Sequence, residues 1–504
     1  MTETPIVDTT SGKIQGRGEG PVHVFRGVPY ARPPVGALRF RAPEPVRAAA
    51  DVLDAGEYGP IAPQMVTPID EQMYGGIVPP QSEDCLSLNV WTPGLDGERR
   101  PVFVWVHGGA FITGASRVPW YDGTRFAERS DAVLVSMNYR LGALGFLDLS
   151  VLGDEYAGSG CAGLLDQVSA LEWVRDNIES FGGDSGNVTV FGESAGGISV
   201  VGLLAMPSAR GLFHRAIAQS AVPGAFSTPD RGAEVLDLVL ADVGLDRERT
   251  RQLVDAPLEQ LVAAQGDIFA GDAFLEGMRF QPVTGIAALP EAPLDAARAG
   301  TLAPVPLITG TNRDELTLFT FMFPSLNQLT RDQLVEQIER AVGSGEQAAT
   351  LFHAYAAARP ELSPSQLGMV VLSDGMFRVP TLRLAERHHA AGNPTWCYRF
   401  DYESPAFGGA MGAAHSFEIP FVFDNIDDPG AAFMLGSGEP QRRLAAAMHG
   451  AWIAFARDGS PQHPDLPEWP RFDDDRRATM RFDLASEVVD DLDGTDRARW
   501  DGAF

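Results

Sequence analysis

Short apolar runs alternate with helix-like stretches through the first half of the chain. Pro101–Val106, Ala132–Met137 and Val188–Phe191 are such runs, each of the length expected for a strand. Between the last two, Asp166–Phe181 carries apolar residues at helical spacing and stops at Gly182–Gly183. Strands that alternate with helices pair in parallel, and a parallel sheet is covered on both faces. The pattern therefore predicts an α/β fold with a mostly parallel central sheet and helices on both faces.

The second half adds two apolar runs, Val305–Thr309 and Trp396–Phe400, which we predict to be late strands of the same sheet. The stretches 224–300 and 316–395 are mostly helical and too long to be plain crossover connections. We interpret them as helical cap or side insertions over the carboxyl-terminal edge of the sheet. We expect one enlarged domain over residues 1–504 that carries both insertions.

The charge balance narrows the range of partners. Lysine and arginine number 39 against 67 aspartates and glutamates, which gives a net charge of −28. Such an acidic surface repels nucleic-acid phosphates and anionic lipid headgroups, so we expect neither nucleic acid nor a membrane as a partner. The sequence has no apolar run long enough to span a membrane, and its N-terminus lacks a signal-peptide pattern. We therefore expect a cytoplasmic protein.

Patterns for metals and cofactors are missing from the sequence. The three cysteines, Cys85, Cys161 and Cys397, lie far apart and form no disulfide or metal-binding pattern. Gly158–Gly163 fits G-x-G-x-x-G, but no strand precedes it, which argues against dinucleotide binding. We expect neither a metal nor a cofactor.

A candidate nucleophile follows the run at Val188–Phe191. Residues Gly192–Gly196 read Gly-Glu-Ser-Ala-Gly, a G-x-S-x-G pattern between a predicted strand and a predicted helix. In this setting the serine lies on a strained turn, and the two glycines leave room for neighbouring backbone. The helix that follows directs its positive end toward developing negative charge. The alternative is a plain strand-to-helix turn, and the five residues alone do not decide between them.

A second glycine-rich turn follows Pro101–Val106. His107-Gly108-Gly109-Ala110 can bring backbone N–H groups close to a substrate oxygen. The alternative is a glycine-rich strand end without function. This segment by itself favours the alternative.

Six groups of segments along the chain form a recognisable series. They are Phe25–Ala31 with Pro33-Pro34 and Leu38–Phe40, Ser82–Val90, Asn138–Gly142 with Gly145–Leu147, Gly163–Gln167, Gly192–Gly196 and Phe213–Ile217. In sequence and in order they resemble the signature segments of the type-B carboxylesterases, a family that includes the cholinesterases. The similarity runs from about residue 5 to residue 482 and implies an α/β-hydrolase fold and ester hydrolysis.

The resemblance implies a catalytic triad with Ser194 as the nucleophile. Gly310–Glu315 is similar to the segment that supplies the acid, which makes Glu315 the acid. Leu316 stands where the family usually has glycine, so Asp314 stays open as an alternative. Ala413–Glu418 is similar to the segment that supplies the base, which makes His415 the general base, with Ser416 in place of the usual glycine. The chain order of serine, acid and histidine is that of this fold.

The resemblance also implies an oxyanion hole. The N–H groups of Gly109, Ala110 and Ala195 would form it, with Gly108 keeping the turn clear. Glu193, next to the nucleophile, has either an electrostatic role near the cleft or the role of a structural carboxylate.

The substrate pocket is assigned on the same resemblance to apolar side chains, of which half could instead be ordinary core. They predict short-to-medium acyl and aromatic esters as substrates, and no tryptophan lies in the 62–81 loop to favour choline esters. The predicted pocket residues are Met73, Tyr74, Phe111, Phe274, Met278 and Phe280.

A cysteine of secreted relatives is missing here. Ala62 stands where the resemblance places the partner of Cys85, so we expect a free, buried Cys85 thiol and a more mobile loop over 62–81.

Two other functions remain open from the sequence. The same triad can hydrolyse carbamates or amides, since only the leaving group and pocket differ. Some members of this family are catalytically inert, adhesion-type binding domains, against which the intact serine, histidine and glutamate argue. The sequence leaves the oligomeric state open.

Overall fold

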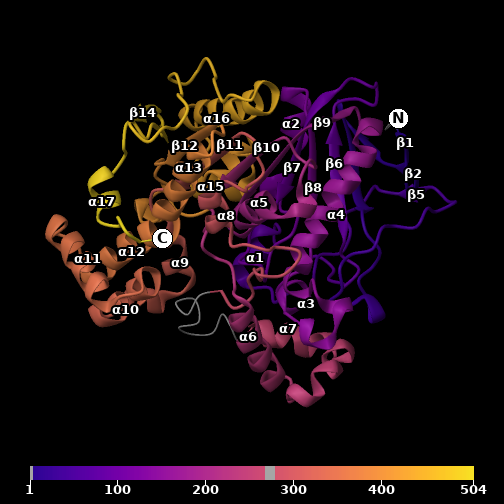
Figure 1. Cartoon of the computed structure of the whole chain (residues 1–504). Helices are drawn as coiled ribbons and strands as arrows, with labels where there is room; N and C mark the ends of the chain where they lie inside the picture. Colours follow the sequence, from indigo (N-terminus) through magenta and orange to yellow (C-terminus); the bar gives the residue numbers. More distant parts are fainter. Residues whose placement is uncertain (1–3, 267–277, 504) are drawn as a thin grey trace.

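The computed structural model describes residues 4–266 and 278–503, and an eleven-stranded sheet runs through its centre (Figure 1). The middle of this sheet is parallel and is made of β7 (Arg100–Val106), β8 (Val133–Met137), β9 (Gly183–Glu193), β10 (Arg215–Gln219), β11 (Leu307–Asn312), β12 (Thr395–Phe400) and β13 (Thr479–Phe482). Antiparallel strands extend both edges, namely β3 (Arg17–Glu19), β4 (Val22–Pro29) and β6 (Ser87–Thr92) at one and β14 (Glu487–Val489) at the other.

The strand order along the sheet is β14-β13-β12-β11-β10-β9-β7-β8-β6-β4-β3. A separate three-stranded sheet is made of β1 (Ile6–Thr9), β2 (Gly12–Gln15) and β5 (Leu53–Asp54). The predicted α/β fold with a mostly parallel sheet is confirmed, and the antiparallel strands at both edges are additions that the sequence did not predict.

All five predicted strands are present. The three early runs lie in β7, β8 and β9, and the two late runs lie in β11 and β12. β11 begins at Leu307 rather than at Val305. Pro304 and Pro306 flank Val305, and proline has no N–H to donate to a strand ladder.

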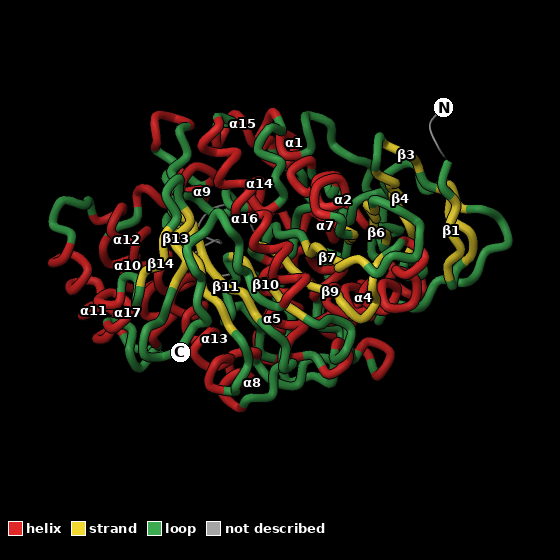
Figure 2. The backbone as a smooth tube through the Cα atoms, turned by 90° about the horizontal axis from the view of Figure 1, so that it is seen from above, coloured by secondary structure: helices red, strands yellow, loops and turns green. Residues whose placement is uncertain are grey.

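The sheet separates two apolar cores, as successive residues of β7 show. Val102, Val104 and Val106 belong to one core cluster, and Phe103 and Trp105 belong to the other. Side chains alternate across a strand, so a strand whose faces are both covered is apolar throughout. The first core includes side chains of α4 (Ala162–Asn177), α5 (Ala195–Ala205) and α8 (Pro293–Ala299), and the second those of α2 (Thr124–Ser130) and α16 (Glu439–Asp458). Figure 2 shows these two groups of helices on opposite sides of the strands.

Helices fill the described parts of both predicted insertions. Residues 224–300 contain α6 (Pro229–Asp242), η8 (Arg247–Asp255), α7 (Leu258–Gly266) and α8. Residues 316–395 contain most of α9 (Glu315–Met322), followed by η10 (Pro324–Gln328), α10 (Arg331–Val342), α11 (Gly345–Ala358), α12 (Pro364–Ser373), a π-helical turn at Asp374–Arg378 and α13 (Val379–Ala390). In Figure 1, α10 and α11 lie at the end of the molecule opposite the N-terminal strands. The description as one domain with two insertions stays a prediction.

The remaining helices are short. They are α1 (Pro68–Met73), α3 (Gly142–Phe146), η6 (Ile178–Phe181), η12 (Ala406–Gly409), α14 (Ile419–Val422), α15 (Pro429–Leu435) and α17 (Gly494–Ala498), with single 3-10 turns at Gly36–Leu38, Pro119–Tyr121, Ser150–Leu152, Asp154–Tyr156, Ser159–Cys161 and Pro207–Ala209. Within the described ranges, no helix is both long and apolar enough to cross a membrane.

The parallel strands bring the predicted site residues to one edge of the sheet. β9 ends at Glu193, immediately before Ser194. β11 ends at Asn312, three residues before Glu315, and β12 leads into the loop that carries His415. Neighbouring parallel strands end at the same edge, and ligand sites of open α/β sheets form there.

Candidate active site

Ser194 lies on a backbone turn that only close packing can hold. Its φ of 56° and ψ of −123° are unusual for a residue with a side chain. A Cβ on Gly196 would lie 2.0 Å from the carbonyl oxygen of Val106, and one on Gly192 would lie 2.6 Å from the carbonyl of Gly196. Both flanking glycines are therefore required for β7, β9 and α5 to meet at this turn.

Glu315 and His415 form a buried pair. A parallel bridge joins Asp314 to Ala414, and the N–H of Asp314 donates to the carbonyl of Ala413 at 3.0 Å. The bridge sets the next residue of each segment side by side. Nδ1 of His415 lies 2.6 Å from Oε2 of Glu315, and both side chains are almost fully buried.

The second ring nitrogen of His415 faces Glu193. Nε2 lies 3.1 Å from Oε1 of Glu193, yet it makes no hydrogen bond to any described residue. Oε1 of Glu193 already accepts the hydroxyl of Ser416 at 2.6 Å. A Cβ on Gly108 would lie 3.0 Å from Glu193 and 3.1 Å from Cβ of Ser194, so these groups converge on one small space. The structure thus brings all three predicted triad residues to the same edge of the sheet.

Asp314 has other partners. Its Oδ2 pairs with the Arg313 guanidinium at 2.7 Å and accepts the N–H of Ala413 at 2.9 Å. Its side chain is partly exposed, whereas that of Glu315 is buried against His415. The geometry therefore favours Glu315 over Asp314 as the partner of the imidazole.

Two further buried carboxyl groups surround this pair. Burial raises the pKa of Glu193, and burial together with Glu193 and Glu315 raises the pKa of Glu418 to about 8. Glu418 accepts from the side-chain amides of Gln219 at 3.1 Å and Asn312 at 2.8 Å. Burial alone would lower the pKa of His415, but the carboxylates of Glu193 and Glu315 outweigh it and raise that pKa to about 9.

Aromatic rings enclose the imidazole. The ring centroids of Phe319 and Phe377 each lie 5.2 Å from that of His415. Phe319 stands one helical turn after Glu315 on α9, and Phe377 comes from the π-helical turn. Such extra-residue turns occur frequently at functional sites.

The second glycine-rich turn lies against the nucleophile. Gly109, Ala110 and Phe111 have φ values of 108°, 52° and 62°, and a Cβ on Gly109 would lie 2.1 Å from the carbonyl oxygen of Thr113. No described acceptor takes a hydrogen bond from the N–H groups of Gly109 and Ala110. These donors, and that of Ala195 at the start of α5, are available to a substrate oxygen.

The side chain of Gln64 fastens this turn. Its Oε1 accepts the N–H of Gly114 at 2.8 Å and the hydroxyl of Thr113 at 2.9 Å, and its Nε2 donates to the carbonyl of Gly114 at 3.0 Å. The expected free and buried Cys85 thiol is confirmed. The greater mobility expected of the 62–81 loop stays a prediction, and Gln64 connects its start to the glycine turn.

The predicted pocket residues differ in how deeply they are buried. Met73 and Tyr74 are half-buried and pack on the second core, and Met278 is half-buried against the first. Phe111 and Phe280 are buried members of the first core. Phe274 lies outside the described residues.

Sequence reasoning missed the groups that support the pair. Glu418 and Ser416 lie in the same segment as His415, so their closeness to it was visible, but their contacts with Asn312 and Glu193 join distant parts of the chain. Gln64 had no sequence signal.

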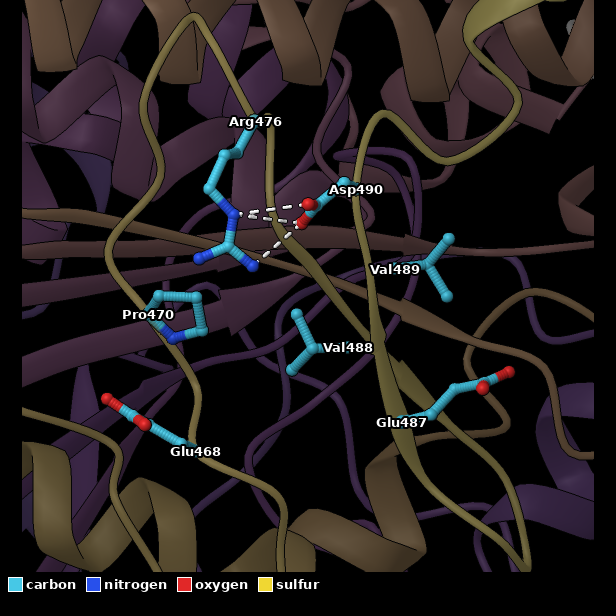
Figure 3. Close-up of a pocket in the computed structure, with 7 residues that line it drawn as sticks. All are labelled: Glu468, Pro470, Arg476, Glu487, Val488, Val489 and Asp490. Carbon is cyan, nitrogen blue, oxygen red and sulfur yellow. Dashed lines mark hydrogen bonds and ion pairs between the residues drawn. The ribbon is translucent and has the colours of Figure 1, made fainter.

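A surface cavity of about 480 Å³ lies elsewhere, at the edge strand β14. Figure 3 shows the ion pair between Arg476 and Asp490 at one end of it and Glu468 and Glu487 toward the other. Its lining contains no nucleophile and no imidazole, so it does not compete with the Ser194 site. The described part of the chain contains no group of three potential metal ligands.

Comparisons with known proteins identify the family of the chain. A family model described as "Carboxylesterase family" matches residues 3–500. The chain belongs to the carboxylesterase family. It is 38% identical over 502 residues to the para-nitrobenzyl esterase of Bacillus subtilis (strain 168), and 39% identical over 499 residues to the phenmedipham hydrolase of Pseudarthrobacter oxydans, covering 98% of each chain in both cases.

The solved structure of the Geobacillus stearothermophilus carboxylesterase EST55 has the same fold. It matches with a TM-score of 0.88 at 38% identity, over 98% of this chain and 99% of that one. This chain is therefore a carboxylic-ester hydrolase with the α/β-hydrolase fold, which sets aside the alternative of an inert binding domain.

We predict that Glu315→Gln lowers kcat by orders of magnitude, because the neutral amide cannot stabilise a protonated His415. Asp314→Asn is the matched control and should change kcat less than about tenfold, since its carboxylate has other partners. Steady-state kinetics on a nitrophenyl ester compares the two. The reverse ranking would move the acid to Asp314.

A pH profile tests the raised pKa of His415. An imidazole acts as a base only when neutral, so kcat/KM should rise with pH toward this pKa. Glu193→Gln removes a nearby negative charge and should move the midpoint of the acidic limb down by about one pH unit. Glu418→Gln should move it in the same direction by less. An unchanged midpoint in Glu193→Gln would contradict the assigned cause.

Proposed function

We propose that the enzyme hydrolyses esters through an acyl-enzyme on Ser194, with His415 as general base and Glu315 as the triad acid. The observation that carries the proposal is the buried 2.6 Å contact between Glu315 and Nδ1 of His415, which leaves Nε2 without a hydrogen-bond partner among the described residues. Ser194, on a strained turn, directly follows Glu193, whose Oε1 lies 3.1 Å from this nitrogen. A nucleophile, a base and a group that orients the base are the parts that this chemistry requires.

The proton path follows from these positions. Nε2 of His415 takes the proton of the Ser194 hydroxyl as the oxygen attacks the acyl carbon, and later gives it to the leaving alcohol. Glu315 accepts the Nδ1 proton, which fixes the tautomer and stabilises the imidazolium. In the second half, a water attacks the acyl carbon with His415 again acting as base, and Ser194 leaves with the proton returned.

The N–H groups of Gly109, Ala110 and Ala195 would stabilise the oxyanion. Gly108 keeps side-chain atoms out of the space between the turn and Ser194, where a Cβ would lie 3.1 Å from the serine Cβ. Preorganised donors of this kind lower the barrier because they need no rearrangement as charge develops. Removal of one typically costs about 2.7–4 kcal/mol.

The charges of the site support neutral substrates. Glu193, Glu315 and Glu418 surround His415, and the chain carries a net charge of −28, so a carboxylate on the substrate meets repulsion. We propose short-to-medium acyl and aromatic esters as the substrate class, with Met73, Tyr74, Phe111, Phe274, Met278 and Phe280 as pocket residues. The half-buried Met73, Tyr74 and Met278 support this assignment, and the full burial of Phe111 and Phe280 limits them to the walls behind it.

Carbamates are a second candidate class. The relative from P. oxydans is named for phenmedipham, a carbamate. The triad attacks a carbamate carbonyl in the same way as an ester, so the pocket and the leaving group would determine the preference.

We propose a cytoplasmic location, which the three free thiols support, since reducing compartments keep cysteines unpaired. The acidic charge supports the expectation of neither nucleic acid nor anionic membranes as partners.

Ser194→Ala should abolish ester turnover while the protein stays folded. Loss of a triad nucleophile typically costs on the order of 10⁶ in kcat. A nitrophenyl acetate assay measures turnover, and circular dichroism with thermal unfolding checks the fold. Hydrolysis within tenfold of the unaltered enzyme, by a folded variant, would reject Ser194.

A substrate panel tests the pocket. The panel contains matched neutral, choline and anionic esters of equal acyl length, together with one aryl carbamate. The neutral ester should react at least as fast as the choline ester and much faster than the anionic one. The comparison is of kcat/KM values. A clear preference for the choline or the anionic ester would mean that the pocket holds a charged partner for it.

A further inference from the structure

Three exposed phenylalanines form a continuous aromatic surface outside the catalytic cleft. Phe321, Phe407 and Phe433 are 44%, 59% and 68% exposed. The ring centroids of Phe321 and Phe407 lie 5.6 Å apart, and those of Phe407 and Phe433 lie 6.1 Å apart. We call these three residues the phenylalanine ridge. Exposed apolar side chains that adjoin one another mark binding surfaces more often than single ones do.

The central ring is held in a strained conformation. Phe407 has a φ of 52° and a ψ of 32°, the left-handed region that bulky residues avoid, and no burial of its ring offsets the strain. The loop around it is fixed on both sides. The N–H of Ser404 donates to the carbonyl of Gly412 at 2.9 Å, and the hydroxyl of Tyr402 donates to the carbonyl of Leu435 at 2.7 Å. Strain maintained at an exposed position indicates a functional surface.

The ridge shares its supports with the catalytic groups. Phe321 stands six residues after Glu315 on α9, which is about 9 Å along a helix axis. Phe407 stands in the same loop as His415, between β12 and α14. The half-buried side chains of Leu318, on α9, and of Met434, next to Phe433 on α15, pack on the same core cluster as Met73 and Tyr74 of the predicted pocket.

The net charge of the chain bears on which molecules can bind the phenylalanine ridge. A second copy of the chain carries the same charge of −28, and an anionic membrane is also negative, so both are repelled at moderate ionic strength. A neutral apolar molecule meets no such repulsion, and an aromatic one can stack on the rings. The proposed ester substrate is a molecule of this kind.

We propose that the phenylalanine ridge is an outer subsite that binds the distal aryl portion of a large neutral ester while its scissile bond lies at Ser194. This inference rests on the proposed function. It makes the ridge a determinant of specificity for extended aromatic esters, with no part in the turnover of small ones.

The test compares two esters with the same leaving alcohol, benzyl acetate and dibenzyl adipate. Only the adipate carries a second ring beyond the reacting ester. Phe407→Gly suits the left-handed backbone, and Phe433→Ser removes the outermost ring. Each should lower kcat/KM for dibenzyl adipate about fivefold, mainly through KM, and leave benzyl acetate unchanged. Leu484→Ser, at a position 52% exposed in the β13–β14 hairpin, is the matched control and should change neither.

Equal losses on both esters, or no loss on either, would overturn the subsite. Size-exclusion chromatography tests the rival occupant: a dimer that dissociates in both ridge variants would assign the ridge to a second copy instead. Turnover of benzyl acetate that survives Ser194→Ala would reject the proposed function. If the ridge variants do not discriminate between the two esters but Ser194→Ala abolishes turnover of benzyl acetate, the subsite is rejected and the proposed function stands.

Discussion

The close approach of three backbone segments at Ser194 is the constraint on which the rest of the site depends. β7, β9 and the start of α5 meet where the flanking glycines have no room for a side chain, and the serine takes a left-handed turn between them. This packing fixes the backbone of Ser194 immediately before the first N–H groups of α5. The glycine turn after β7 packs against Glu193 and Ser194, so the same backbone contacts position the nucleophile and the N–H donors.

Around this point the enzyme maintains an unusual density of buried carboxyl groups. Glu193, Glu315 and Glu418 surround a single imidazole, and each has its own polar partners: Ser416, the N–H of Asn312, and the amides of Asn312 and Gln219. Buried acids without such partners would be strongly destabilising. The carboxylates of Glu193 and Glu315 raise the pKa of His415, so the arrangement favours the protonated imidazole that the proposed reaction forms.

The sequence predicted what short-range patterns encode. The apolar runs identified five of the seven parallel strands, and family motifs identified Ser194, Glu315 and His415 as candidates that the fold then brought to one edge. The antiparallel edges were missed because β3, β4, β6 and β14 depend on pairing partners rather than on a distinctive local pattern. Gln64, Glu418 and the ridge were missed for a related reason: contacts such as Gln64 with Gly114 and Phe407 with Phe433 join loops whose approach only the folded chain determines.

The Gln64 contacts carry one more consequence. The amide joins the 62–81 loop to the glycine turn through hydrogen bonds, near the position where secreted relatives are expected to have a covalent cross-link. A fastening of this kind opens and recloses thermally and needs no oxidant to reform. The attachment of the loop to the donors next to the nucleophile therefore does not depend on the oxidation state of any cysteine.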